Sequence, residues 1–371
     1  MKNISKSIYY LTYQDFPANT ANSQQTVATC KYFVRNKFNV KLFFPLRSKF
    51  SDDNLNSLKK IYEFTKEDFD VVGIIHKTKF EGTNKFKRIM YLFSHILWAQ
   101  HAVRKVVKEY ENPLTFYTRS DWVFFFLSNK NKPVVLECHK ITKIRKKLIK
   151  YSIRSESSKI IFINEALKDE VSLKTKYYDK VLVQTAGYDE DFFYTSENKI
   201  SKQIVYSGSL SRLGLNRDLD FIFSSFNDER LSDFNLKVYG GTEDEISIFK
   251  SKYKHISNIT FNTHLSKKNL GIELSESEIG ILASSNDKYS KYFTDPLKFY
   301  EYCASGLKII ATDFPAHKNL NKTANITFFT HGDEESFINA VLIANKDTGR
   351  NEIKFLETYD SRIKNIIEFI S

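Results

Sequence analysis

The sequence has few cysteines and no long apolar run. Its three cysteines, Cys30, Cys138 and Cys303, are scattered along 371 residues without the spacing of a metal site or a disulfide framework, which favours a reducing compartment. No apolar stretch approaches the roughly 18 residues that a membrane span needs. The opening MKNISKSIYYLTY also has no signal-peptide core. Together these absences predict a cytoplasmic protein.

Internal repeats, low-complexity tracts and the motifs of RNA- or DNA-binding modules are also missing. The chain does have material for a core, since 42% of its residues are hydrophobic and 15% aromatic, and its length suits two domains. Lys and Arg outnumber Asp and Glu by 56 to 44, and this net charge of +12 indicates an anionic partner. Charge alone leaves nucleic acid, a membrane and a phosphorylated substrate open.

Short apolar segments, rich in β-branched and aromatic residues, alternate with helical stretches along most of the chain. The predicted strands are 8–13, 40–44, 71–75, 114–118, 134–138, 160–164 and 181–184, followed by 204–207, 236–239, 259–261, 279–283, 307–311 and 326–329. This alternation predicts an α/β protein with two doubly wound parallel sheets, each with its site at the carboxyl ends of the strands. The polar stretch 195–201 suggests domains at 1–197 and 198–350, with a last helix at 351–371 that returns to the first domain.

The segment 294–315, TDPLKFYEYCASGLKIIATDFP, carries the strongest local signal. Asp295 is a suitable helix cap, Pro296 suits the first helical position and Gly306 suits a left-handed stop, which predicts a helix over 296–305 before the strand. Lys298 then falls in the first turn, where the helix end is already positive and backbone N–H groups are free. A cation placed there predicts a bound anion such as a phosphate.

Glu301 lies three residues after Lys298, on the same helix face and about one turn deeper. Its carboxylate is able to accept hydrogen bonds from two neighbouring hydroxyls, such as those of a ribose. The stretch PLKFYEYCASG resembles the nucleotide-sugar site of retaining glycosyltransferases of family 4, which have the GT-B fold. The resemblance implies two Rossmann-like domains facing each other across a cleft. It also implies that Glu301 binds the ribose and that Pro296, Leu297 and Lys298 face the diphosphate.

One position departs from the family pattern. The family has an acidic residue eight positions before this Glu, in contact with the donor sugar, and here that position is Phe293. Asp295 is close in sequence but two residues displaced. The resemblance therefore leaves open which group contacts the sugar.

Two further segments of the second domain extend the resemblance. In IVYSGSLSRLG the turn at Gly208 and Ser209 would bring the backbone to the diphosphate, and Arg212 would contact it, with Arg217 as the next candidate. A solvated loop charge is the alternative for Arg212. The stretch KVYGG places Gly241 near the nucleotide, and His264 falls where the family holds the base.

In the first domain, PVVLECH resembles a family strand that ends in a His beside the donor sugar. A neutral His139 would hydrogen-bond a sugar hydroxyl, and a structural histidine is the alternative. Asn22, in the loop 15–23, would either cap the following helix or approach the donor.

The resemblance implies a retaining transfer from a nucleoside diphosphate sugar that needs no metal or other cofactor. His139, Lys298 and Arg212 are the predicted catalytic residues. Lys298 and Arg212 would stabilise the leaving diphosphate, and neither a DxD-like pair at a strand end nor a carboxylate nucleophile is recognisable. A lipid-linked glycan of a bacterial surface polysaccharide is the expected acceptor. A GT-B nucleotide-sugar epimerase, a noncatalytic polysaccharide- or membrane-binding paralogue and a nucleic-acid-binding protein remain alternatives.

Two stretches are strongly basic. In 140–150, KITKIRKKLIK, Ile141, Ile144 and Leu148 recur at helical spacing among lysines. Such a helix either lies on an anionic membrane surface or turns its apolar face into the core. The second stretch, 77–88, contains Gly82 and Asn84 and is predicted to be a loop.

Overall fold

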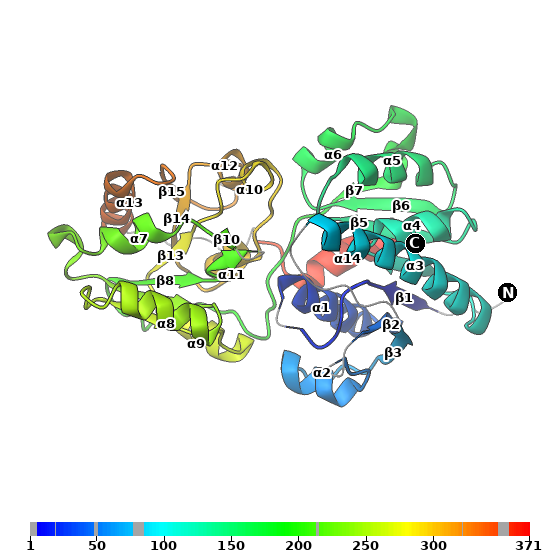
Figure 1. The fold of residues 1–371 in the computed structure, drawn as a ribbon, viewed down its shortest axis with the longest axis horizontal. Helices are drawn as coiled ribbons and strands as arrows, with labels where there is room; N and C mark the ends of the chain where they lie inside the picture. The colour runs from blue at the N-terminus through cyan, green and yellow to red at the C-terminus, as the bar shows by residue number, and fades with distance from the viewer. Residues whose placement is uncertain are drawn as a thin grey trace. The chain divides into compact units, whose positions relative to one another are not determined.

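The computed structural model describes residues 6–18, 20–47, 51–76, 85–212, 215–320, 322–347 and 356–371; the side chains of 85–88, 211–212 and 215–216 are outside this description. The chain divides into two compact units (Figure 1). Unit 1 comprises Met1–Thr185 and Tyr359–Ser371, and unit 2 comprises Ala186–Thr358. The chain therefore crosses between the units at Thr185–Ala186 and at Thr358–Tyr359, whereas the sequence suggests boundaries at 197 and 350.

Unit 1 is built on a seven-stranded parallel sheet with the order β3-β2-β1-β4-β5-β6-β7. Its strands are β1 (Ser7–Leu11), β2 (Asn39–Leu46), β3 (Asp70–Ile75), β4 (Thr115–Thr118), β5 (Val134–Cys138), β6 (Ser158–Phe162) and β7 (Val181–Val183). The order reverses between β1 and β4, so the carboxyl ends of these two strands form the switch point where α/β sheets place their sites. The seven strand predictions for this domain are confirmed.

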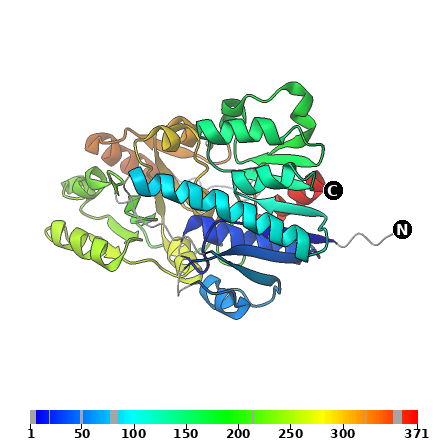
Figure 2. The same cartoon turned by 45° about the vertical axis from the view of Figure 1, so that its right-hand side comes forward.

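The helices of unit 1 cover both faces of this sheet (Figures 1 and 2). They are α1 (Ala21–Arg35), α2 (Leu55–Tyr62), α3 (Lys85–Glu109), α4 (Asp121–Ser128), α5 (Lys143–Ser152), α6 (Glu165–Val171) and α14 (Tyr359–Ile370), with a 3-10 turn at Thr175–Lys180. Helix α14 packs on α1, and the rings of Tyr32 and Tyr359 stack at 5.6 Å. Thr20, not Asn22, caps α1, because its side chain accepts the backbone N–H of Ser23.

Unit 2 contains a six-stranded parallel sheet with the order β12-β11-β8-β13-β14-β15. Its strands are β8 (Gln203–Ser207), β11 (Asn235–Tyr239), β12 (Ile259–Asn262), β13 (Ile279–Leu282), β14 (Lys308–Thr312) and β15 (Ile326–Phe329). They confirm the second set of strand predictions. A small antiparallel pair, β9 (Ser211–Arg212) and β10 (Leu215–Asn216), was not expected from the sequence.

The helices of unit 2 hold this sheet between two apolar layers. They are α7 (Asp220–Ser225), α8 (Glu243–Lys252), α9 (Lys267–Glu276), α10 (Lys288–Tyr292), α11 (Leu297–Ala304), α12 (Pro315–Leu320) and α13 (Glu334–Lys346), with a 3-10 turn at Glu229–Leu231. Neighbouring strand residues alternate between the layers, as Tyr206 and Val205 do on β8. Helix α11 belongs to the second layer through the buried rings of Phe299 and Tyr302.

The start of α11 differs from the prediction in one respect. Pro296 is the N-cap residue, without a side-chain cap, and Asp295 does not cap the helix. The Asp295 carboxylate instead accepts the backbone N–H of Ala186 at 2.6 Å and the hydroxyl of Tyr300 at 2.7 Å. Its partners are thus one residue far away in the sequence and one a turn further along the helix. Gly306 provides the left-handed stop, with φ of 69°.

Candidate active site

Lys298 lies in the first turn of α11 and its ammonium group is buried. Among the described residues, its Nζ has no hydrogen-bond partner. The same atom lies 4.2 Å from the centre of the Tyr206 ring. Burial, and then the charge of Arg217, hold the pKa of Lys298 well below its usual range, against the opposing effect of Glu301. A buried cation without a hydrogen-bonded anion is unfavourable, which points to a ligand that supplies the negative charge.

Arg217 is the second cation of this site. Its Nε is also buried and has no partner within the described part of the chain. The sequence favours Arg212 over Arg217 as the residue that contacts the diphosphate. The backbone of Arg212 lies in β9, and its side chain is outside the described residues. Helix α11 adds free donors, because the described residues offer no hydrogen-bond acceptor to the backbone N–H groups of Leu297 and Lys298. Two cations and the N–H groups of a helix start thus lie close together, an arrangement that suits an anion.

Gly208 and Gly240 make this convergence possible at the carboxyl ends of β8 and β11. The N–H of Gly208 donates to the carbonyl of Tyr239 at 2.8 Å. A Cβ at Gly240, whose φ is 136°, would lie 2.1 Å from the Gly208 carbonyl oxygen. A Cβ at Gly208 would lie 3.3 Å from Nζ of Lys298. Gly240 is thus required for close backbone approach, and the φ of 139° at Gly208 favours glycine in the predicted turn.

The remaining predicted nucleotide contacts lie at neighbouring strand ends. The Ser209 carbonyl accepts the hydroxyl of Tyr206 at 3.3 Å. His264 follows β12, and its Nε2 accepts the backbone N–H of Gly241 at 3.4 Å. The structure therefore brings Gly241 and His264 together, and Gly208 together with Lys298. Whether these residues bind a nucleotide stays a prediction.

Glu301 is buried and already has a partner. Its Oε1 pairs with Nζ of Lys267 at 3.0 Å, and this lysine also lies 5.2 Å from the centre of the Phe193 ring. Lys267 is the first residue of α9, so the ion pair joins two helices of unit 2. The pairing fixes one carboxylate oxygen of Glu301. Nothing in the sequence distinguishes Lys267 from the many other lysines.

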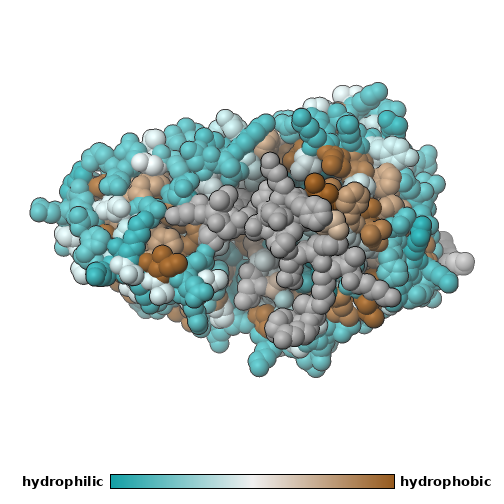
Figure 3. All heavy atoms as spheres, viewed as in Figure 1, coloured by the Kyte–Doolittle hydropathy of each residue, from teal (hydrophilic) through white to brown (hydrophobic). Residues whose placement is uncertain are grey.

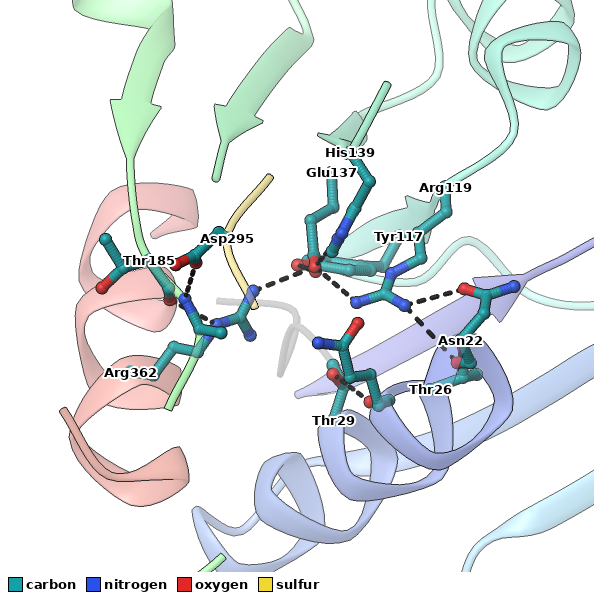
Figure 4. Close-up of polar contacts among 12 residues, drawn as sticks. Asn22, Thr26, Thr29, Tyr117, Arg119, Glu137, His139, Thr185, Asp295 and Arg362 are labelled. Carbon is teal, nitrogen blue, oxygen red and sulfur yellow. Dashed lines mark hydrogen bonds and ion pairs between the residues drawn. The ribbon is translucent and has the colours of Figure 1, made fainter. Parts of the chain in front are cut away.

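In unit 1, His139 directly follows β5 and belongs to a buried charge cluster (Figure 4). Its Nε2 bonds to Oε1 of Glu137, a residue with no exposed surface. Nη2 of Arg119 lies 2.7 Å and Nη2 of Arg362 3.0 Å from the same oxygen. The hydroxyl of Tyr117 donates to the other oxygen. This carboxylate is therefore held on all sides by cations and donors.

The cluster sets the protonation of its members. Burial alone would raise the pKa of Glu137, but Arg119 and Arg362 outweigh it and hold this pKa well below the usual range. Burial, and then Arg119, lower the pKa of His139 to about 4, although Glu137 opposes this shift. His139 is therefore neutral at pH 7, as a hydrogen-bonding role requires. Its side chain keeps 27% of its surface exposed, so the ring is accessible at the strand end.

Asn22 lies beside this cluster. Its Oδ1 accepts a hydrogen bond from Nη1 of Arg119 at 2.8 Å, as Figure 4 shows. The sequence motifs do not predict that Arg119, Glu137 and Arg362 belong to the site. One signal was available, because PVVLECH places an acidic residue inside an otherwise apolar parallel strand, where a charge needs buried partners. Nothing in the sequence of α14 distinguishes Arg362 from a surface arginine.

One peptide group stands at the boundary between the units. The carbonyl of Thr185 accepts Nε of Arg362 at 3.0 Å, and the N–H of Ala186 donates to Asp295. Figure 4 shows both contacts. Arg362 of unit 1 thus bonds to the carbonyl of this peptide and Asp295 of unit 2 to its N–H group. The first residue also contacts Glu137, and the second lies three residues before Lys298 in the sequence.

Comparison with solved structures gives the fold. Sucrose-phosphate synthase from Thermosynechococcus elongatus is similar with a TM-score of 0.67 and 12% identity, over 98% of this chain and 94% of that one. The fold is that of the GT-B glycosyltransferases. The lipopolysaccharide outer core galactosyltransferase WaaB is similar with a TM-score of 0.64 and 11% identity, over 98% and 99% of the two chains. HepE of Anabaena, solved with UDP and glucose, is similar with a TM-score of 0.60 and 12% identity, over 97% and 94%.

The likeness to GT-B structures covers both units of the chain, at identities that establish the fold alone. No protein-family model and no curated protein matches the sequence. The GT-B prediction is confirmed by the two parallel sheets and by these neighbours. The reaction has to be argued from the site.

Proposed function

We propose that the protein is a retaining glycosyltransferase that takes its sugar from a nucleoside diphosphate sugar. The observation that carries the proposal is the pair of buried nitrogens at the start of α11, Nζ of Lys298 and Nε of Arg217, which have no partner among the described residues. A diphosphate would supply two or more negative charges at this point and accept the free backbone N–H groups. HepE and WaaB, which share the fold, support a sugar transfer.

The proposed mechanism depends on charge that develops at the leaving group. As the glycosidic bond breaks, the diphosphate becomes more negative, and Lys298, Arg217 and the start of α11 stabilise it from fixed positions. No metal is needed for this role, since the two cations provide the positive charge. Glu301 binds the ribose with the oxygen that Lys267 leaves available. Retention follows if the leaving phosphate deprotonates the acceptor hydroxyl on the same face of the sugar.

His139 acts on the sugar rather than on the nucleotide in this proposal. Because this neutral imidazole donates its single N–H to Glu137, it accepts a hydrogen bond from a sugar hydroxyl. The acceptor we propose is a polyprenyl-linked glycan of bacterial surface polysaccharide synthesis, at the cytoplasmic face of the membrane.

Nucleotide binding is the direct test. In a thermal-shift panel of nucleoside diphosphates and their sugars, the cognate donor at about 100 times its dissociation constant should raise the melting temperature by about 3 °C. Glu301→Gln should lose the preference for the ribonucleotide over its 2′-deoxy analogue, since an NH2 group, which cannot accept from the ribose hydroxyls, replaces the oxygen that Lys267 leaves available. A panel in which every nucleotide leaves the melting temperature unchanged would contradict the proposal. If the protein epimerised a bound donor without an acceptor, it would be an epimerase rather than a transferase.

His139→Ala is expected to lower kcat by about tenfold to a hundredfold, because a hydrogen bond to the reacting sugar is lost. Nucleoside diphosphate affinity, measured by calorimetry, should change less than about twofold, since no phosphate contact is removed. His139→Asn retains a hydrogen-bonding group and serves as the matched control, with part of the activity restored. Unchanged turnover in His139→Ala would make this histidine a structural partner of Glu137.

A further inference from the structure

An apolar stripe runs along the exposed side of α3. Ile89, Phe93 and Leu97 recur every four residues, and their side chains are 53%, 57% and 55% exposed. Residues with this spacing lie on one face of a helix. Three large apolar side chains in line, each more than half exposed, are unusual on the surface of a soluble domain and mark an interaction site.

Aromatic residues continue this stripe over the neighbouring helices. Helix α4 packs against both α3 and α5. Its outward side chains Trp122, Phe125 and Phe126 are only partly buried, and the Phe125 ring lies 5.6 Å from the ring of Tyr151 on α5. Figure 3 shows apolar residues gathered over the part of unit 1 that these helices cover. We call this surface, formed by the exposed sides of α3, α4 and α5, the α3–α5 face.

The exposure of its residues bears on the two interpretations of the basic helix at 140–150. Helix α5 turns Ile149 and Ser152 into the protein, whereas Ile144 is 49% and Tyr151 50% exposed. The apolar residues that the sequence singled out are therefore not all core residues, since Ile144 faces outward. Lys143, Lys147 and Lys150 are exposed beside it and form no ion pair with a described residue.

The charges of the α3–α5 face are almost all positive. Helix α3 carries six Lys or Arg residues and α5 carries five, whereas Glu109 and Asp121 are the only acidic residues of the three helices. Asp121 is buried and paired with Arg145 at 3.2 Å. A second copy of the same face would bring two positive surfaces together, which is unfavourable. An anionic bilayer offers both the negative charge and the apolar layer that the exposed rings need.

We propose that the α3–α5 face docks the protein on the surface of an anionic lipid bilayer. Phe93, Leu97 and Tyr151 enter the boundary between headgroups and acyl chains, and Lys143, Lys147 and Lys150 contact the anionic headgroups. The attachment is peripheral: none of the helices within the described ranges is long and apolar enough to cross a bilayer. It places an enzyme with a lipid-linked acceptor at its substrate, but it does not depend on the nucleotide site.

Vesicle co-sedimentation tests this docking without donor or acceptor. The full chain should bind vesicles of phosphatidylcholine and phosphatidylglycerol, and binding should weaken as salt increases. Phe93→Ser with Leu97→Ser should lower the partition coefficient at least about tenfold, because both side chains enter the acyl region. Lys143→Gln, Lys147→Gln and Lys150→Gln combined should lower it by roughly fivefold for each lysine.

Matched controls come from unit 2. Ile248→Ser with Ile343→Ser removes equally exposed apolar residues, and Lys250→Gln, Lys254→Gln and Lys346→Gln combined remove the same charge. Both control variants should bind as the parent does. Absent vesicle binding, or equal losses in test and control variants, would overturn the docking, as would a dimer in solution that only Phe93→Ser with Leu97→Ser dissociates. Each of these outcomes leaves the proposed reaction intact, because nucleotide binding is measured separately.

Discussion

Lys298→Ala is expected to lower kcat/KM by about a thousandfold, because it removes a preorganised cation from the leaving diphosphate. The same substitution should leave the free energy of unfolding unchanged or increase it. Nζ of Lys298 is buried without a partner in the described part of the chain, and burial already lowers its pKa. Removing an uncompensated buried charge stabilises the empty protein. Loss of activity together with a gain of stability distinguishes a ligand-binding lysine from a structural one.

The measurement combines initial rates with urea denaturation. Lys298→Met keeps most of the side-chain volume beside the Tyr206 ring and removes only the charge, so it serves as the matched control and should lose activity equally. Nucleoside diphosphate binding should weaken in both variants. Normal turnover, or a loss of stability in Lys298→Met as large as the loss of a core residue, would show that Lys298 supports the fold rather than the diphosphate.

Acid is expected to unfold unit 1 before unit 2. Burial lowers the pKa values of His76, His95 and His139 to about 4 in unit 1; in unit 2 it lowers that of His317 to about 4 and also lowers that of His331. An unfolded histidine takes up its proton near pH 6.5, whereas the first four of these folded histidines do so only near pH 4. The contribution of these histidines to the free energy of unfolding is therefore fully present above pH 6.5 and is lost as the pH falls toward 4. Each histidine contributes at most about 1.4 kcal/mol per pH unit.

Tryptophan fluorescence follows this transition in unit 1 alone, because the chain has two tryptophans, Trp98 and Trp122, and both lie in unit 1. The urea midpoint from fluorescence should fall steeply between pH 7 and pH 5. Hydrogen exchange on peptides of unit 2 is the internal control and should show a smaller loss of protection over the same range. A fluorescence midpoint that stays constant from pH 7 to pH 5 would contradict the predicted histidine environments.

The sheets were predictable because each strand is a short apolar run whose burial on both faces shows directly in its composition. The β9–β10 pair was not, since two-residue strands carry no periodic signal. The prediction that Asp295 caps the helix is wrong for another reason. Its carboxylate accepts a hydrogen bond from Ala186, which is distant in the sequence, whereas capping rules consider only neighbouring residues.

The α11 part of the candidate site could be predicted from the sequence, whereas the charge cluster around Glu137 could not. Lys298 and Glu301 occupy one turn of one helix, so their relation follows from spacing alone. Glu137 receives its cations from β4–α4 and from α14, segments that only the completed fold brings together. The sequence alone ranks Arg217 behind Arg212, because no local spacing relates Arg217 to Lys298. Sequence thus predicts sites built within one element far better than sites assembled from several.

The peptide plane between Thr185 and Ala186 is restrained by two hydrogen bonds: its carbonyl oxygen accepts one from Arg362, and its N–H group donates one to Asp295. Any bending of the chain at this crossing must be absorbed by the single-bond torsions on either side of that rigid plane. The contact to the oxygen comes from Arg362 in α14. Loss of α14 would therefore remove this contact and also one of the cations that hold the Glu137 carboxylate next to His139.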